Sequence, residues 1–480
     1  MAQTKNNFYK IKEIVKHDIN YYHALGFDAD HCILRYNLVT CNQILYQGFF
    51  ESILAEQEFK NLQKQYPTVD QHDYFMKISE KELAFSMNYT ILDRENYTSL
   101  KIVEGKKIVK GYKGLQELNI SELKEIYGND LTIKDYDPLE AKYHKRYFLG
   151  QTFLDVVFIL CFAKLFEYFK KIGEIKNYGG YQIWDIIKKA VNQNYAHYND
   201  DEVFKISDFG TVFPKLVENA EKLIFKQHKL KEIFQTIKKR DNKFLFIATN
   251  SHYEFVNMNL TLALGDDWSD LFDLVIVQSQ KPAIFQDSEK TGYLLDLNEK
   301  NFQRKQPIED RDLEFVNGQL PNKFFVKGNY KMIEKIIENY HNYNLQNKSK
   351  TDCQEKIAFF GDNYPGDCQA PEQIPDQSWD AFFICPEILE ENQELRSQIP
   401  DPEFIYNYQQ WWGSYFYHDS EEILELNQEE EKLQQQQQKE QEKQNQLLES
   451  YWINHISQSI RGGICGQLDT KEMIEKFWLL

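Results

Sequence analysis

The stretch "HALGFDAD" (residues 23–30) places two aspartates directly after a short apolar segment. Four further apolar runs also end in polar or turn residues, with helix-like sequence between most of them: "KFLFIATN" (243–250), "DLVIVQS" (273–279), "KIAFFGDN" (356–363) and "DAFFICP" (380–386). Continuous apolar strands separated by helical segments are typical of a parallel sheet with helices on both faces. The sequence therefore predicts an α/β fold with a doubly wound, Rossmann-like parallel sheet.

Polar side chains stand at the carboxyl ends of four of these expected strands. They are Asp28 with Asp30, Thr249 with Asn250, Lys281, and Asp362. In an open parallel sheet, ligands bind outside the carboxyl ends of the strands, so we expect these residues to meet at one place. The aspartate pair alone leaves three readings open, which are a metal ligand, a nucleophile and a solvated turn, and the convergence favours an active site.

The expected strands divide the chain into parts. About 210 residues separate the first strand from the second, which is too long for a loop, and we interpret 41–234 as an inserted, mostly helical cap domain. Within it, 98–114 has the pattern of a β-hairpin. The catalytic core would comprise 1–40 and 235–420. The remainder, 421–480, reads as a Gln/Glu-rich linker followed by a C-terminal helix.

Composition limits the classes of partner. The 480 residues are 42% hydrophobic with a net charge of −18, a globular composition whose surface would repel nucleic acid and anionic lipid. Seven cysteines without a Cys-x-x-Cys pair indicate a reducing compartment, and no apolar signal core opens the chain. The apolar run 153–166 predicts a buried helix rather than a membrane span. We expect a cytoplasmic protein without a nucleic-acid or membrane partner, and self-association into a homo-oligomer is left open.

The predicted site contains several carboxylates. Asp28 and Asp30 are one residue apart, so in an extended chain both side chains would face one pocket. Asp362, and Asp367 five residues later, add two more carboxylates. Hard oxygen ligands in this number suit Mg²⁺, and the lack of a nearby His or Cys cluster disfavours zinc.

Three other residues suit a phosphate ester. Lys281 supplies the positive charge that a phosphate beside carboxylates requires, and Thr249 and Asn250 can donate hydrogen bonds to its oxygens. Together with a carboxylate nucleophile and a metal, these are the parts of an enzyme that works through an aspartyl-phosphate.

These residues resemble the motifs of the haloacid dehalogenase superfamily. "FDADHCILRYN" is similar to its first motif, "FLFIATNS" to its second, "QKPAIF" to its lysine motif and "FFGDNYPGD" to its fourth, in the same order. Within the superfamily, the chain resembles the cytosolic 5′-nucleotidases and 5′-nucleotidase domain-containing proteins. That likeness includes "RYFLGQTFLDVV" (146–157) and "WGSYF" (412–416), and it covers about residues 20–420.

The resemblance implies a Mg²⁺-dependent phosphomonoesterase, most simply a 5′-nucleotidase that acts on nucleoside 5′-monophosphates. Asp28 would attack the phosphorus, and Asp30 would protonate the leaving oxygen and then activate water. The metal would lie between the Asp28 carboxylate, the Asp30 carbonyl and Asp362, with support from Asp367. The remaining residues, Thr249, Asn250 and Lys281, would hold the phosphoryl group.

The sequence departs from the family pattern at three places. Cys32 replaces the threonine of the first motif, and Asn363 replaces the usual histidine of the fourth. Leu154 and Asp155 stand where the purine-specific cytosolic 5′-nucleotidases of this family have Phe-Asn, so no aromatic side chain on which a base could stack is evident there. These changes and the Gln-rich tail motivate an alternative, a non-catalytic interaction or regulatory protein on the same fold.

Overall fold

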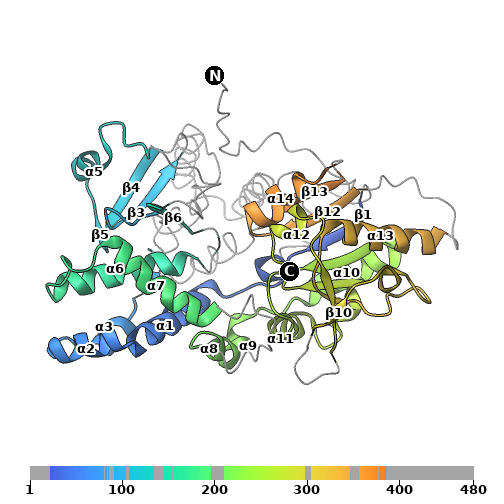
Figure 1. The fold of residues 1–480 in the computed structure, drawn as a ribbon, viewed down its shortest axis with the longest axis horizontal. Coiled ribbons are helices and arrows are strands. Elements are labelled where there is room, and N and C mark those ends of the chain that lie inside the picture. Colours follow the sequence, from blue (N-terminus) through green and yellow to red (C-terminus); the bar gives the residue numbers. More distant parts are fainter. Residues whose placement is uncertain are drawn as a thin grey trace, which may run out of the picture.

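A computed structural model describes residues 22–79, 82–83, 85, 91–103, 107–133, 145–150, 152, 155–195, 210–297, 304–345, 356–375 and 378–384 (Figure 1). The described chain is a mixed α/β structure with two sheets, which occupy opposite halves of the view in Figure 1. The "WGSYF" segment, the Gln-rich tail and the expected C-terminal helix lie outside the described residues.

The larger sheet has eight strands in the order β10-β9-β11-β8-β7-β1-β12-β13. Its strands are β1 (Tyr22–Phe27), β7 (Phe244–Ala248), β8 (Leu274–Val277), β9 (Gly292–Leu295), β10 (Arg304–Pro307), β11 (Phe324–Lys327), β12 (Lys356–Gly361) and β13 (Trp379–Phe383). All five strands expected from the sequence are present and parallel to their neighbours. The sequence did not predict β11, which continues the parallel order, or β9 and β10, which form an antiparallel edge.

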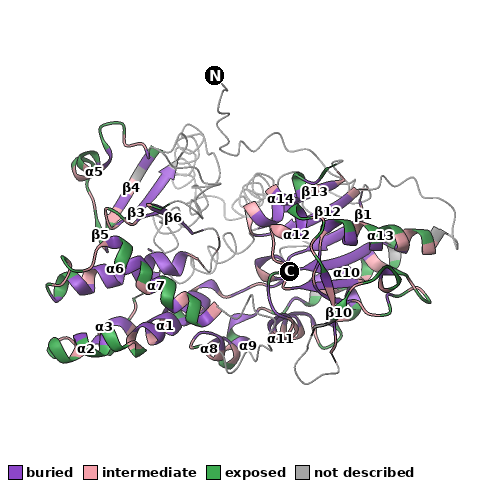
Figure 2. Ribbon diagram, in the orientation of Figure 1, coloured by how far each residue is buried: buried purple, intermediate pink, exposed green. Residues whose placement is uncertain are grey.

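Helices cover both faces of this sheet, which Figure 2 shows with buried strands between partly exposed helices. They are α10 (His228–Thr236), α11 (Tyr253–Leu264), α12 (Ala283–Gln286), α13 (Tyr330–Leu345) and α14 (Ala370–Glu372). Alternate residues of β7 belong to different apolar clusters. Leu245 and Ile247 share one with α10 and α11, and Phe244 and Phe246 share the other with α12, α13 and α14. Burial on both faces explains why the strand is continuously apolar.

Most of the chain between β1 and β7, from α1 to α9, builds the second half. Its helices are α1 (Leu38–Ala55), α2 (Gln57–Gln65), α3 (Gln71–Met76), α5 (Ile120–Tyr127), α6 (Val156–Lys171), α7 (Gly180–Tyr195), α8 (Phe213–Glu218) and α9 (Ala220–Leu223). Its antiparallel sheet has the order β5-β4-β3-β2-β6, from β2 (Ile91–Asp93), β3 (Thr98–Val103), β4 (Lys107–Lys113), β5 (Gln116–Glu117) and β6 (Tyr147–Leu149). The hairpin expected at 98–114 is therefore confirmed, but it is the centre of a larger sheet within a segment expected to be mostly helical.

The apolar run 153–166 falls largely in α6, whose residues Val156 to Leu165 are all buried. No described helix combines the length and apolar character that a membrane span requires. The helix α1 is continuous from 38 to 55, so the expected domain limit at 40/41 falls inside it. The limits of a core and a cap stay a prediction.

Candidate functional site

The first strand delivers Asp28 to the carboxyl edge of the large sheet. β1 lies between β7 and β12, and the Asp28 amide donates to the Phe360 carbonyl at 2.8 Å. The Asp28 carboxylate accepts the Ala29 amide on Oδ1 at 2.8 Å, which fixes its orientation. The loop that follows turns at His31, where φ is 53°, before α1 begins with an Asn37 side-chain cap.

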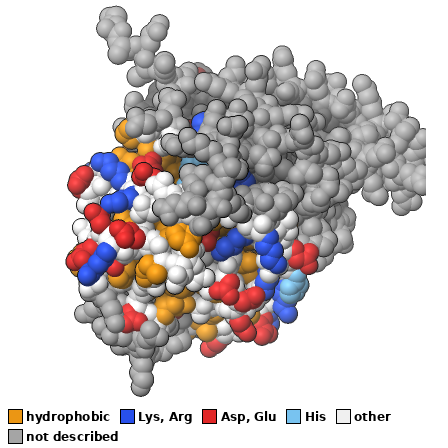
Figure 3. All heavy atoms as spheres, turned by 90° about the vertical axis from the view of Figure 1, so that its right-hand side faces the viewer, with side chains coloured by type: hydrophobic (Ala, Val, Ile, Leu, Met, Phe, Trp, Pro, Cys, Tyr) orange, Lys and Arg blue, Asp and Glu red, His pale blue; other side chains and the backbone are white. Residues whose placement is uncertain are grey.

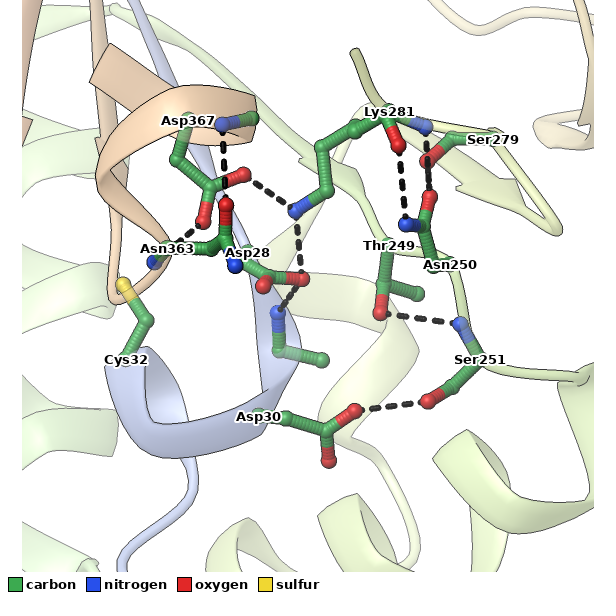
Figure 4. A network of polar contacts seen from close by, with 12 residues as sticks. Asp28, Asp30, Cys32, Thr249, Asn250, Ser251, Ser279, Lys281, Asn363 and Asp367 are labelled. Atoms are coloured by element: carbon green, nitrogen blue, oxygen red, sulfur yellow. Dashed lines mark hydrogen bonds and ion pairs between the residues drawn. The ribbon is translucent and has the colours of Figure 1, made fainter. Parts of the chain in front are cut away.

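Lys281 enters the same place from the loop after β8. Its ammonium lies 2.8 Å from Asp28 Oδ1 and 2.7 Å from Asp367 Oδ1, so it bridges a carboxylate that follows β1 and one that follows β12 (Figure 4). Its side chain is 3% exposed. Burial alone would lower the pKa of Lys281, but the two carboxylates outweigh it and raise the pKa above its ordinary value. The two carboxylates therefore favour the charged form of this buried lysine.

Three buried carboxylates from two loops form one cluster. Ligand oxygens of Asp28, Asp362 and Asp367 all lie within 4.8 Å of one another. The close approach of Asp367 depends on Gly361, because a Cβ there would lie 2.4 Å from the Asp367 carboxyl carbon. Asp367 Oδ2 also accepts the amide of Asn363 at 2.9 Å.

The charge of this cluster is only partly balanced. Three carboxylates and the Lys281 ammonium carry a net charge of −2 when all are ionised. Burial and the neighbouring carboxylates raise the pKa of Asp362 well above its ordinary value, and burial raises that of Asp367 to about 6 despite Lys281. A compact set of buried oxygen donors with excess negative charge fits a divalent cation.

The second expected strand end, β7, places Thr249 and Asn250 beside this cluster. The Thr249 side chain is buried, and its hydroxyl accepts the Ser251 amide at 3.3 Å. The Asn250 side chain holds the lysine loop, since its Oδ1 accepts the Lys281 amide at 2.6 Å and the Ser279 hydroxyl at 2.9 Å. Its Nδ2 donates to the Lys281 carbonyl at 3.2 Å. Asn250 therefore contacts the backbone of Lys281, and substrate binding by both residues stays a prediction.

The carboxylate of Asp30 turns away from the acidic cluster and toward β7 (Figure 4). Its Oδ2 accepts the hydroxyl of Ser251 and its Oδ1 that of Tyr36, each at 2.6 Å. Burial and the charge of Asp28 raise the pKa of Asp30, which those two hydroxyls counteract. A raised pKa suits a group that must carry a proton. Neither Ser251 nor Tyr36 was predicted as a site residue from the sequence, although both lie inside the motifs "FLFIATNS" and "FDADHCILRYN".

Two of the three departures noted in the sequence fall on described residues that stabilise these loops. The Cys32 thiol donates to the Phe360 carbonyl at 3.4 Å, and burial raises its pKa well above the ordinary value, so it stays protonated. Asn363 caps the turn before Asp367, because its Oδ1 accepts the Gly366 amide at 2.9 Å. At the third departure, Asp155 directly precedes α6, and its side-chain Oδ2 accepts the Thr152 amide at 3.2 Å.

A buried carboxylate, a bridging lysine and further carboxylates therefore lie together at the carboxyl edge of a parallel sheet, which is where open α/β sheets bind their ligands. Comparison with known proteins gives the class. The chain matches the family model described as the 5′ nucleotidase family over residues 12–461, so it belongs to that family, and it is a phosphoric monoester hydrolase.

Individual relatives are distant. The chain is similar to human 5′-nucleotidase domain-containing protein 1, with 22% identity over 383 residues, which are 79% of this chain and 74% of the relative. The bovine protein of the same name is 22% identical over 385 residues, 79% of this chain and 75% of its own length. Human 5′-nucleotidase domain-containing protein 2 is 26% identical over 297 residues, 60% of this chain and 50% of the relative.

Proposed function

We propose that the chain hydrolyses nucleoside 5′-monophosphates in two steps and carries the phosphoryl group on Asp28. The observation that carries this proposal is the ammonium of Lys281, which bridges Asp28 and Asp367 inside a buried cluster of carboxylates. Both described contacts of the Asp28 carboxylate, from Lys281 and from the Ala29 amide, fall on Oδ1. That arrangement leaves Oδ2 as the oxygen that attacks phosphorus.

In the first step, Asp28 forms a bond to phosphorus while the bond from phosphorus to the ribose oxygen breaks, and Asp30 gives its proton to that oxygen. In the second step, Asp30 takes a proton from a water molecule, whose oxygen bonds to phosphorus as the bond to Asp28 breaks. Lys281 and the donors at the end of β7 balance the charge of the phosphoryl oxygens.

Magnesium is the proposed metal. Asp28, Asp362 and Asp367 would hold it, together with the Asp30 carbonyl. When bound, it would neutralise charge on the phosphoryl oxygens and so lower the barrier to transfer. The donors fit because they are all oxygens, and because the net charge of the cluster is negative.

The test is phosphate release from a panel of nucleoside 5′-monophosphates and from nitrophenyl phosphate, with Mg²⁺ or with a chelator. We expect Mg²⁺-dependent release that falls more than about a thousandfold in Asp28→Asn, because the nucleophile is lost. Asp267→Asn is the matched control, since that aspartate is exposed and pairs with Lys231 away from the site. Equal phosphate release by Asp28→Asn and wild type would refute the mechanism. A preference for nitrophenyl phosphate over every nucleotide would refute the proposal that nucleoside 5′-monophosphates are the substrates.

A further inference from the structure

Both oxygens of the Asp30 carboxylate are held by side-chain hydroxyls. Ser251, from the loop after β7, donates to Oδ2, and Tyr36, from the loop before α1, donates to Oδ1. Tyr36 and Ser251 are each 4% exposed, so these contacts are buried from solvent. Two donors that arrive from different parts of the fold leave the carboxylate little freedom to rotate about its χ angles.

The two donors are themselves anchored. Asn259 of α11, which is 2% exposed, donates through Nδ2 to the Tyr36 hydroxyl at 3.3 Å. The backbone of Tyr36 forms a β-bridge with Ile224, and its ring packs on His31 with centroids 4.7 Å apart. Ser251 is tied to the neighbouring loop, because its carbonyl accepts the Gln278 amide at 3.0 Å. The hydroxyls are therefore held in position by contacts within the fold.

This support matters because Asp30 lies in the loop between β1 and α1 and not in a regular strand. The chain turns at His31, and the Asp30 carboxylate points away from Asp28 and Lys281 toward Ser251 (Figure 4). A general acid must present its proton within hydrogen-bond reach of the leaving oxygen, and an error of about 1 Å can reduce the rate a hundredfold. Hydrogen bonds to a charged group are also about twice as strong as neutral ones, so the pair can define this geometry.

We propose that Tyr36 and Ser251 are positioning residues that aim the Asp30 carboxyl at the leaving oxygen and hold it there. The inference rests on the proposed function, in which Asp30 gives a proton to that oxygen as its bond to phosphorus breaks. Neither hydroxyl bonds to the substrate in this scheme. Their effect passes through Asp30 and is confined to reactions in which a proton must be delivered.

The experiment uses leaving groups that differ in their need for a proton. The value of kcat/KM, which reports the steps up to phosphoryl transfer, is measured for a nucleoside 5′-monophosphate and for nitrophenyl phosphate. The nitrophenolate leaves without a proton, whereas the ribose oxygen needs one. In Tyr36→Phe and Ser251→Ala we expect the ratio of nucleotide to nitrophenyl kcat/KM to fall by about 10- to 100-fold. Asp30→Asn should lower the ratio at least as far.

Two matched variants control for general loss of buried hydroxyls. Tyr127→Phe removes a hydrogen bond to the buried Asp93 at 2.8 Å, and Ser52→Ala removes one to Thr211 at 2.6 Å, both in the half built between β1 and β7. We expect the ratio to change by less than about twofold in each, even where overall activity falls with stability.

The outcomes separate the inference from the function on which it rests. Parallel losses on both esters in Tyr36→Phe and Ser251→Ala would overturn the inference, because a merely structural role reduces both reactions equally. A ratio in Asp30→Asn that equals the wild-type ratio would also overturn it. A wild-type chain that hydrolyses neither ester would refute the proposed function and this inference with it.

Discussion

Replacement of Asp362 by asparagine should stabilise the metal-free chain. Ligand oxygens of Asp28, Asp362 and Asp367 lie within 4.8 Å of one another. Two unit charges at that distance repel by about 3.5 kcal/mol at an effective dielectric constant of about 20. Asp362 faces two such neighbours, and Lys281 offsets roughly one of the repulsions. Removal of its charge should therefore raise the free energy of unfolding by up to about 3 kcal/mol.

Magnesium should reverse this order. A cation that binds only the native state at 1,000 times its Kd stabilises that state by about 4.1 kcal/mol, which exceeds the advantage of about 3 kcal/mol that Asp362→Asn has without metal. The wild-type chain gains this stabilisation through three anionic donors, whereas Asp362→Asn retains two and loses most of the gain. We therefore expect Asp362→Asn to be more stable than wild type in a chelator and less stable than wild type in Mg²⁺.

The measurement is the midpoint of urea unfolding for both chains, with a chelator and with Mg²⁺ at several concentrations. A difference of 2–3 kcal/mol corresponds to a shift of about 1 M urea. Asp267→Asn, on the exposed surface, should follow the wild type in both solutions. The reasoning is refuted if Asp362→Asn is destabilised in the chelator, or if Mg²⁺ shifts both midpoints equally.

The same advantage of Asp362→Asn should depend on pH. Burial raises the pKa of Asp362 well above its ordinary value of 3.8, so the folded chain binds that proton more tightly than the unfolded chain. The cost of ionisation is then fully present at pH values above the folded pKa. It shrinks as pH falls and is lost below 3.8, where both states hold the proton, so the two chains should converge there when metal is absent.

Two further substitutions test the loops and the smaller sheet. Cys32→Thr should retain activity and raise the free energy of unfolding in urea by about 0.5–1 kcal/mol. The reason is that a hydroxyl donates a stronger hydrogen bond to the Phe360 carbonyl than the thiol, which lies 3.4 Å from it. A loss of activity would contradict this expectation. Arg146→Gln should destabilise the chain by about 3 kcal/mol, because the carboxylate of Asp93, which is 0% exposed, loses two hydrogen bonds from the Arg146 guanidinium at 3.0 and 2.8 Å. A urea midpoint within about 0.2 M of the wild-type value, which corresponds to about half a kcal/mol, would contradict this expectation.

The sequence predicted the parallel part of the sheet because burial on both faces leaves a strong signal. β7 is apolar over all five of its residues and β12 from Ile357 to Phe360, and polar residues mark where these strands end. Short strands leave no such signal. β11 has four residues and runs directly into the turn before α13, and β5 has two exposed ones, so neither can be separated from its surroundings by periodicity.

The meeting of the candidate residues at one edge of the sheet was predictable to the same extent, and for the same reason. Asp28, Lys281 and Asp362 follow parallel strands, so topology alone brings them to one edge. The direction of each side chain was not predictable, because loop backbone decides it. An extended chain would have pointed Asp28 and Asp30 the same way, but the two carboxylates have different partners, Lys281 and Ser251. The contact of Asn250 with the lysine loop depends on the same unpredictable geometry.

The cost of the acidic cluster bears on the choice between catalysis and a role in binding alone. We expect three buried carboxylates with one lysine to destabilise the metal-free fold, and an uncharged residue of similar size in place of Asp362, which forms neither ion pair with Lys281, would relieve that cost. A chain that only docked a partner through its surface would gain nothing from them. Charge held at such a cost is typical of sites that must bind a cation or move a phosphoryl group. The thiol of Cys32 does not weaken this argument, because it reaches the Phe360 carbonyl and leaves the carboxylates and Lys281 in contact.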